Sequence, residues 1–269
     1  MPELPEVETI VRRLDPSLSG SQILKVDLRW ERSLAEPGSV EFAKRLYHQT
    51  IQRVSRRGKF IRLHLTVGQL LIHLRMSGDL DIKVGEYSPE KHDRLVLGLS
   101  GDRSLVFKDT RKFGRVWLTT DPDKVLGALG PEPLVDAFTA KVLFDRLHDR
   151  HRQLKSLLLD QTFLAGLGNI YTDEALHKAK LHPCRISDSL TMLEVKALWQ
   201  AIRKVLQEGI RRNGASIDWV YRGGDFQNHF RVYGRTGQAC PVCGTIIERI
   251  LVGQRGTHYC PSCQPEKDG

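Results

Sequence analysis

The sequence predicts an α+β multidomain chain with a leading helix, an N-terminal β-sandwich or barrel, a helical region and a zinc-binding C-terminal segment. Three observations support this class. Apolar and polar residues alternate from about residue 23 to residue 119, with glycines between the runs, as is typical of β-sandwiches and barrels. Beyond residue 134 the apolar spacing becomes helical. Two CxxC pairs lie near the end of the sequence.

The composition is that of a basic globular protein. The chain has 269 residues, of which 41 are Lys or Arg and 32 are Asp or Glu, giving a formal net charge of +9. This basic excess favours a polyanionic partner such as nucleic acid. No apolar run approaches the roughly 18 residues of a membrane span, and the acidic opening differs from a signal peptide. We therefore expect a cytoplasmic protein without membrane contacts.

The first predicted element is an amphipathic helix that begins near Pro5. Pro5 suits an early helical position, and Glu6 and Glu8 lie in the first turn, where the helix dipole favours acidic groups. The apolar face is formed by Val7, Ile10, Val11 and Leu14. Residues 16–20, which include Pro, Ser and Gly, are expected to end this helix.

Short strands follow the helix. Ile61, Leu63 and Leu65 alternate with Arg62 and His64, which is the period of a strand with one buried face. The Gly- and Pro-rich residues 130–134 then mark a boundary. We expect domains at residues 1–130, 131–232 and 233–269, with the folded part of the last at about 233–267.

The clearest helix of the second region is predicted to start after Thr191. Glu194 stands three positions later, which is the signature of a capping box. The apolar face is formed by Val195, Leu198, Ile202, Val205 and Leu206. Asn213 and Gly214 should end this helix.

Four of the five cysteines form two pairs separated by 16 residues, and these are Cys240, Cys243, Cys260 and Cys263. Four thiolates at this spacing can close a tetrahedral Zn²⁺ site. A segment this short cannot bury enough apolar area to fold alone, and we therefore expect one structural zinc ion to stabilise it. Because four protein thiolates fill the site, the zinc should have no open catalytic position. Reactive or disulfide-bonded cysteines are the alternative. Cys184 has no partner pair and is interpreted as a packing residue.

The residues at the N-terminus could supply a nucleophile. Removal of Met1 would leave Pro2 with a secondary amine, and an α-amino group titrates near pH 8, so part of it is neutral at pH 7. Neutral amines form Schiff-base intermediates with carbonyl-like carbons. Glu3 could act beside it as a general acid or base. The alternative is a proline without a chemical role.

Several further motifs occur in order along the chain. They are PELPEVET at 2–9, RGKF at 57–60, HLRMSG at 73–78, KHD at 91–93, DTRKFG at 109–114, GPEPL at 130–134, GLGNIY at 166–171, VYGR at 232–235 and the terminal CxxC pairs. Together these motifs resemble the bacterial formamidopyrimidine-DNA glycosylase family, also called Fpg or MutM. The resemblance covers essentially the whole chain.

The resemblance implies an N-terminal β-sandwich led by a helix, a helical domain with a helix–two-turn–helix element, and a C-terminal zinc finger. It implies a bifunctional glycosylase and abasic-site lyase of base excision repair, acting as a monomer on double-stranded DNA. The substrates would be oxidised purines, chiefly 8-oxoguanine and formamidopyrimidines, and abasic sites. The enzyme would form a Schiff base at the N-terminal proline and cut the strand by β,δ-elimination.

The same resemblance assigns the catalytic roles. Pro2 would attack the anomeric carbon and Glu3 would transfer protons. Lys59 would assist elimination, and Arg255 would grip a phosphate and take part in the final elimination. Lys59 also has the parity of Ile61 on its strand, so it should point to the apolar face; a snorkelling side chain is the alternative. Without the resemblance, Arg255 would be either a solvated turn residue or a DNA contact.

An enzyme that acts on a stacked base must extrude it and fill the gap. By resemblance Met76, Arg111 and Phe113 fill that gap. Apolar side chains suit a wedge between bases, and Arg can hydrogen-bond the orphaned partner base. Core packing is the alternative for Met76 and Phe113. Lys155 matches a family position near the lesion pocket.

Contacts to DNA phosphates are expected from side chains spread over the whole chain. They are Lys59, His73, His92, Arg111, Arg150, Asn169, Tyr233 and Arg255. Arg150 stands where the family has a lysine, so a cation is kept. Residues 166–169 precede an expected helix, whose exposed N–H groups would bind an anion. Without the resemblance, residues 166–169 would be interpreted as a loop. His92 would be interpreted as a surface histidine.

One segment departs from the family pattern. Residues 219–226 fall where the family has a mobile loop that caps the flipped base, and the segment is shorter here, which leaves the preferred base open. Two other functions remain open at this stage. One is an endonuclease VIII-like glycosylase for oxidised pyrimidines, and the other is a non-catalytic zinc-ribbon DNA-binding protein.

Overall fold

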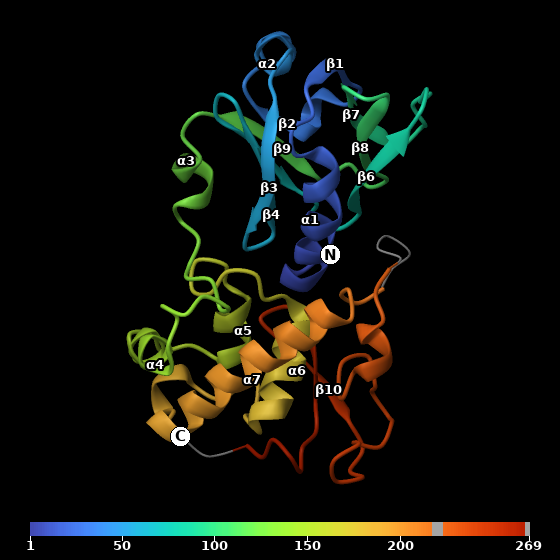
Figure 1. Cartoon of the computed structure of the whole chain (residues 1–269). Helices are drawn as coiled ribbons and strands as arrows, with labels where there is room; N and C mark the ends of the chain where they lie inside the picture. The colour runs from blue at the N-terminus through green and yellow to red at the C-terminus, as the bar shows by residue number, and fades with distance from the viewer. Residues whose placement is uncertain (217–222, 267–269) are drawn as a thin grey trace. The chain divides into compact units, whose positions relative to one another are not determined.

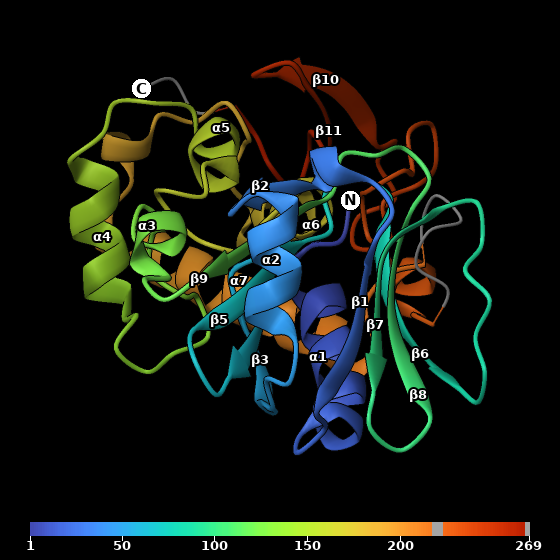
Figure 2. The ribbon, with the colours of Figure 1, turned by 90° about the horizontal axis from the view of Figure 1, so that it is seen from above.

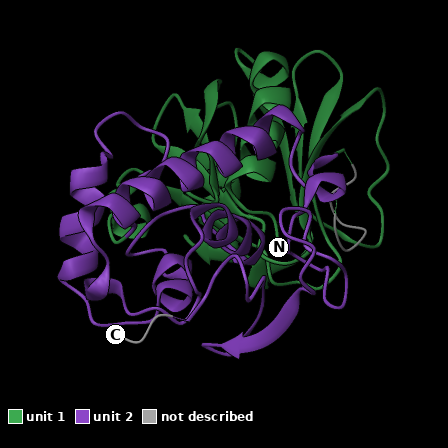
Figure 3. Ribbon diagram, turned by 90° about the horizontal axis from the view of Figure 1, so that it is seen from below, with its two compact units in different colours: residues 1–128, 216–223 green, residues 129–215, 224–269 purple. Residues whose placement is uncertain are grey.

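The computed structural model describes residues 1–216 and 223–266; Figure 1 shows the chain coloured along its length. Its contacts divide the chain into two compact units (Figure 3). Unit 1 contains residues 1–128 and 216–223, and unit 2 contains residues 129–215 and 224–269. Among the described residues, no helix is long and apolar enough to cross a membrane.

Unit 1 contains two sheets that face a common apolar core. Their strand orders are β1-β7-β8-β6 and β2-β9-β5-β4-β3. The strands are β1 (Ile23–Leu28), β2 (Leu34–Glu36), β3 (Ile51–Arg57), β4 (Phe60–Leu65), β5 (Gln69–His73), β6 (Gly78–Val84), β7 (Asp93–Leu99), β8 (Arg103–Asp109) and β9 (Arg115–Thr119). In β4 the residues Ile61, Leu63 and Leu65 are buried, and Ile61 lies opposite Ile72 of β5. The predicted β-sandwich with period-two burial is confirmed.

The leading helix α1 (Leu4–Leu18) closes one side of this sandwich. It packs against β3 and β4 of the larger sheet and against β6 of the smaller one. Figure 2 shows α1 beside β3. Its predicted apolar residues, from Val7 to Leu14, join the core of both sheets. The helix runs through Pro16 and ends at Leu18, with Ser19 as its C-cap. Pro16 therefore lies within the last turns, where its missing N–H removes one hydrogen bond without stopping the helix.

Unit 1 also contains two short helices that the sequence pattern did not predict. Helix α2 (Ser39–Leu46) buries only Phe42 and Leu46, which stand four positions apart. Helix α3 (Asp123–Leu126) follows β9. Two apolar residues in one turn are too few to distinguish a helix from a strand within an alternating region.

Unit 2 begins with a group of helices. They are α4 (Ala140–His148), α5 (Leu154–Leu159), α6 (Asn169–Ala179) and α7 (Met192–Arg211). Turns over residues 160–168 join α5 to α6. The two helices and these turns form the helix–two-turn–helix element. Helix α7 packs against α4 and α6. Thr191 and Glu194 form the predicted capping box at its start, and Asn213 and Gly214, with φ of 56° and 80°, follow its end.

The C-terminal part of unit 2 is a small hairpin with a cysteine cluster. Strands β10 (Glu248–Val252) and β11 (Arg255–Tyr259) pair in antiparallel register. Gly253 and Gln254 form the turn with φ of 53° and 64°, the double positive φ of a type I′ hairpin. Arg255 is therefore the first residue of β11, directly after the turn.

Candidate functional site

The structure divides the predicted site residues between the two units, and each group is described by itself. Unit 1 holds Pro2, Glu3, Lys59, His73, Met76, His92, Arg111 and Phe113. Unit 2 holds Arg150, Lys155, Asn169, Tyr233, Arg255, Cys240, Cys243, Cys260 and Cys263. Half of the expected capping segment at 219–226, namely residues 219–222, lies outside the described residues.

Glu3 is the N-cap of α1, and Pro2 precedes it. A capping box links Glu3 to Glu6, with the backbone N–H of Glu3 donating to Glu6 Oε2 at 2.7 Å. Pro2 is buried, and both carboxyl side chains are 2% exposed. The positive end of the helix dipole favours carboxylates at this position. The fold therefore fixes the Pro2–Glu3 peptide while Met1 remains half exposed.

Lys59 lies in the two-residue turn between β3 and β4. Gly58 takes φ of 54°, and Arg57 pairs with Phe60 across the turn. Lys59 is only 4% exposed, so the fold buries most of this residue. Burial, followed by the charges of Arg75 and Lys59, lowers the pKa of His73 to about 3. The positive charge of Lys59 therefore helps to keep the His73 imidazole neutral.

The three predicted gap-filling side chains project from two loops of unit 1. Met76 is 41% exposed and Phe113 is 50% exposed, although both are large apolar residues. Arg111 is exposed as well, and its guanidinium lies 5.0 Å from the centre of the Phe113 ring. This exposure excludes core packing for Met76 and Phe113. Both side chains are therefore accessible to a partner.

A buried acid, Asp109, positions both of these loops and was missed from sequence. Ser77, next to Met76, donates its hydroxyl to Asp109 Oδ1. The backbone N–H of Arg111 donates to Asp109 Oδ1 at 3.2 Å, and that of Gly114 donates to Oδ2 at 2.7 Å. A Cβ on Gly114 would lie 2.4 Å from the Phe107 ring, so only glycine fits. The available signal was an aspartate at the start of a turn.

In unit 2 a buried network surrounds Lys155. Its ammonium donates to Asp173 Oδ1 and to the carbonyl of Asn169, and neither Lys155 nor Asp173 has exposed side-chain area. The other oxygen of Asp173 accepts the backbone N–H of His258 at 2.9 Å. Asn169 Nδ2 donates to the carbonyl of Gly256 at 2.8 Å. The network joins α5 and α6 to β11. Lys155 therefore lies in the interior of unit 2 and not on its surface.

The other predicted contacts of unit 2 lie on or near its surface. Arg255 and Arg150 are exposed, and no ion pair of Arg255 occurs among the described residues. The Tyr233 ring meets the His258 ring edge-on at 5.0 Å. Asn169 is the first residue of α6, after Gly168 as N-cap. In unit 1, His92 is half-buried beside Arg94, with His92 Nδ1 3.3 Å from Arg94 Nη2.

Glu174 is a second buried acid that the sequence did not reveal. Its carboxylate accepts the backbone N–H groups of Arg231, Val232 and Tyr233 at 2.9 to 3.0 Å. Burial raises the pKa of Glu174, while these three hydrogen bonds lower it. The carboxylate thus fixes the backbone that presents Tyr233.

The four paired cysteines form a metal centre. Their sulfur atoms lie within 4.8 Å of one another. Tetrahedral zinc with Zn–S bonds of about 2.3 Å requires sulfur atoms about 3.8 Å apart. Cys240 and Cys263 are 3.9 Å apart at sulfur, and Cys243 and Cys260 are 3.5 Å apart. The donor set suits one structural Zn²⁺, with all four positions filled by protein thiolates.

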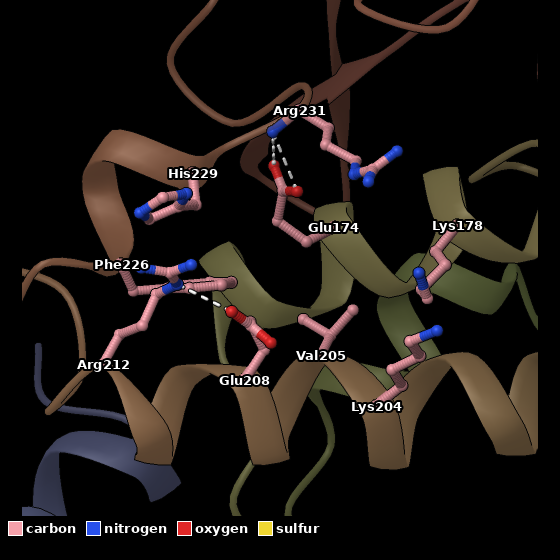
Figure 4. A pocket seen from close by; sticks show the side chains of 9 residues that line it. All are labelled: Glu174, Lys178, Lys204, Val205, Glu208, Arg212, Phe226, His229 and Arg231. Carbon is pink, nitrogen blue, oxygen red and sulfur yellow. Dashed lines mark hydrogen bonds and ion pairs between the residues drawn. The ribbon is translucent and has the colours of Figure 1, made fainter.

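A separate cavity of about 330 Å³ lies between α6, α7 and the short helix η3 (Phe226–His229). Its walls are formed by Glu174, Lys178, Lys204, Val205, Glu208, Arg212, Phe226, His229 and Arg231 (Figure 4). Glu208 accepts from Arg212 at 2.7 Å within it. It contains none of the predicted site residues, so it is distinct from the candidate site.

A β-sandwich led by a helix, a helix–two-turn–helix element and a four-cysteine finger together define a DNA glycosylase of the helix–two-turn–helix class. Three family models match in this order: the formamidopyrimidine-DNA glycosylase N-terminal domain at residues 1–116, its H2TH domain at 129–220, and the zinc finger found in FPG and IleRS at 237–265. The chain belongs to the formamidopyrimidine-DNA glycosylase family.

Curated relatives and solved structures agree with this membership. The formamidopyrimidine-DNA glycosylase of Pelotomaculum thermopropionicum is 43% identical over 99% of this chain and 100% of its own length. That of Chloroflexus aggregans is 45% identical over 98% of both chains. Fpg of Lactococcus lactis in complex with Fapy-dG-containing DNA has a TM-score of 0.92 at 37% identity, covering 98% of this chain and 100% of that one. These matches do not favour the endonuclease VIII-like or non-catalytic alternatives.

Proposed function

We propose that this chain removes oxidised purines, such as 8-oxoguanine and formamidopyrimidines, from double-stranded DNA and then cuts the strand at the abasic site. The observation that carries the proposal is the buried Pro2–Glu3 segment, fixed by the capping box of α1, in a chain that matches Fpg proteins over its whole length. Solved Lactococcus lactis Fpg complexes contain Fapy-dG or abasic-site DNA. The reaction belongs to base excision repair in the cytoplasm, and we propose that the enzyme acts as a monomer.

The chemistry begins once Met1 is removed, because with Met1 attached the Pro2 nitrogen is an amide. The free secondary amine attacks the anomeric carbon of the damaged nucleotide. A bond forms between nitrogen and that carbon, and the bond from the carbon to the base breaks, with the base leaving as a protonated species. The nitrogen gives up its own proton, and Glu3 protonates the ring oxygen as the bond from that oxygen to the anomeric carbon breaks, which leaves an iminium ion. The resulting iminium ion acidifies the neighbouring carbon, so elimination of the 3′ phosphate can follow.

Lys59 and Arg255 are proposed to act on the elimination steps. Lys59 is buried in the β3–β4 turn, and we propose that its amine accepts or donates a proton during elimination. Arg255 presents an exposed, always charged guanidinium that can bind a phosphate with two parallel hydrogen bonds. A phosphate held in this way is a better leaving group because its developing negative charge is stabilised.

Base extrusion is proposed to depend on the two loops of unit 1 that Asp109 positions. Met76 and Phe113 would enter the base stack, and Arg111 would bind the unpaired partner base. Phosphates would be bound by His73, His92, Arg150, Asn169 and Tyr233, and by the N–H groups at the start of α6. Since Lys155 is fully buried, we propose that it positions Asn169 rather than touching DNA. The proposed domains are residues 1–130, 131–232 and 233–269, with the finger at about 233–267.

Borohydride trapping tests this proposal. The full chain is incubated with an 8-oxoguanine:C duplex, with a duplex containing an oxidised pyrimidine, and with an undamaged duplex. We expect a covalent adduct and strand cutting with 8-oxoguanine, and little of either with the other two. A preference for the pyrimidine lesion would identify an endonuclease VIII-like enzyme. Binding to all three duplexes without any adduct would identify a non-catalytic binder.

A further inference from the structure

A histidine of the helical region reaches the zinc site from outside the finger. His177 lies on the buried face of α6, and its Nε2 is 3.5 Å from the sulfur of Cys240. Both residues are 3% exposed. The distance is within the range of a hydrogen bond to sulfur. The contact joins residues 63 positions apart in the chain, so it depends on the packing of α6 against the finger.

The other ring nitrogen of His177 has no such partner. Among the described residues, Nδ1 of His177 is buried without a hydrogen bond. Within the same residues the contact with Cys240 is the only hydrogen bond of the ring. A buried polar group without a partner costs free energy, and a phenyl ring would occupy the same space without that cost. The polar function of His177 is therefore directed at the sulfur.

We propose that His177 donates its Nε2–H to the zinc-bound thiolate of Cys240 and thereby stabilises the metal centre. Four thiolates around Zn²⁺ leave a net negative charge, part of which lies on the buried sulfur of Cys240, and an N–H donor spreads that charge. The four sulfur atoms fill the tetrahedral site, so His177 is not a ligand. A neutral imidazole carries one N–H, and the contact with sulfur assigns it to Nε2. His177 is thus a positioning residue that acts through Cys240.

The test uses the full chain with Co²⁺ in place of zinc, because sulfur-to-cobalt charge-transfer absorption reports the charge on the thiolates. His177→Phe keeps a ring of similar size and removes the N–H. We expect a shifted charge-transfer band and a zinc affinity, measured by chelator competition, that is weaker by about 10-fold or more, as for other partners of metal ligands. His177→Gln places an amide N–H near the position of Nε2, so it should restore most of both quantities.

His182 provides a matched control. It is also a buried histidine near the finger, but its ring contacts Tyr259 at 4.9 Å and its Nδ1 accepts the N–H of Cys184. His182→Phe should leave the cobalt spectrum unchanged. The proposal is overturned if His177→Phe has the spectrum and zinc affinity of the parent chain. It is also overturned if His177→Phe and His177→Gln are equally impaired, or if His182→Phe shifts the band as much, because packing would then explain the effect.

Discussion

Lys155 and Asp173 form an ion pair in which neither side chain has any exposed area. Asp173 uses its second oxygen to bind the backbone N–H of His258, three residues beyond Arg255 on β11. The ammonium of Lys155 also donates to the carbonyl of Asn169. One buried charge pair thus fixes the start of α6 and the strand that begins with Arg255. Both are proposed phosphate-binding elements.

Breaking this pair should destabilise unit 2 and weaken DNA binding together. Asp173→Asn leaves the Lys155 ammonium buried without its counter-charge, which costs about 3–5 kcal/mol. Urea denaturation should show this loss in the free energy of unfolding. Lys155→Met combined with Asp173→Asn should cost clearly less than the sum of the single variants. Strict additivity would mean that the two residues do not act as a pair.

Loss of the metal should unfold the finger and leave unit 1 folded. Cys260→Ser removes a fully buried thiolate from a small core that also contains Val232, Cys240 and Ile247, with Cys263 packed against it. Since metal binding supplies the folding free energy of such modules, bound zinc should fall from one ion per chain to none. Hydrogen exchange should increase over residues 237–265 and stay unchanged in the β-sandwich. Full DNA affinity in the metal-free chain would contradict a role of the finger in binding.

The salt dependence of DNA binding should identify the phosphate contact of Arg255. Each phosphate that a cation neutralises adds about 0.9 to the slope of log affinity against log salt. Arg255→Ala should therefore lower that slope by about 0.9 on undamaged duplex. Arg211→Ala is the matched control, because Arg211 is an exposed arginine paired with Glu208 on α7. An unchanged slope for Arg255→Ala would mean that Arg255 does not neutralise a DNA phosphate.

The features that local sequence specifies could be predicted, and those that depend on long-range burial could not. The capping box of Thr191 and Glu194 and the spacing of the cysteines are local signals, and both are confirmed. Asp109 and Asp173 resemble solvated acids in the sequence, because only the folded chain surrounds them with donors. For the same reason the burial of Lys155 could not be foreseen.

Acid should destabilise unit 1 through His73. Its pKa falls from 6.5 to about 3 on folding, mainly by burial. Between these values the unfolded chain binds the proton and the folded chain does not, so stability is lost as the pH falls. From pH 7 to pH 5 this amounts to about 2 kcal/mol. His73→Asn keeps an acceptor for the Arg75 N–H, which His73 Nδ1 now binds at 3.0 Å.

The parent chain and His73→Asn are each denatured at pH 7 and at pH 5. The two proteins have all other titrating groups in common, so the difference between their losses of stability is the contribution of His73. The free energy of unfolding of the parent chain should fall by about 2 kcal/mol more than that of His73→Asn. An equal loss in the two proteins would show that His73 is not kept neutral by the fold.

The catalytic assignment predicts two different losses at the N-terminus. Two additional residues before Pro2 turn its nitrogen into an amide without a nucleophilic lone pair. Base excision and strand cutting should then both collapse, while affinity for an abasic-site analogue stays within a few-fold. Glu3→Gln keeps the shape of the capping side chain but removes the proton-transferring group. It should bind the analogue normally and lose base excision by about 10²-fold or more.

Glu8→Gln is the matched control for Glu3→Gln, because Glu8 lies on the same helix and pairs with Arg12 and Arg56. It should keep full excision activity, since its carboxylate is occupied by two arginines outside the proposed chemistry. Mass spectrometry of the trapped peptide then locates the nucleophile. We expect the sugar fragment on Pro2 of the chain that has lost Met1. An adduct on Lys59 or on another lysine, with Pro2 unmodified, would refute the assignment, because the iminium ion would then form elsewhere.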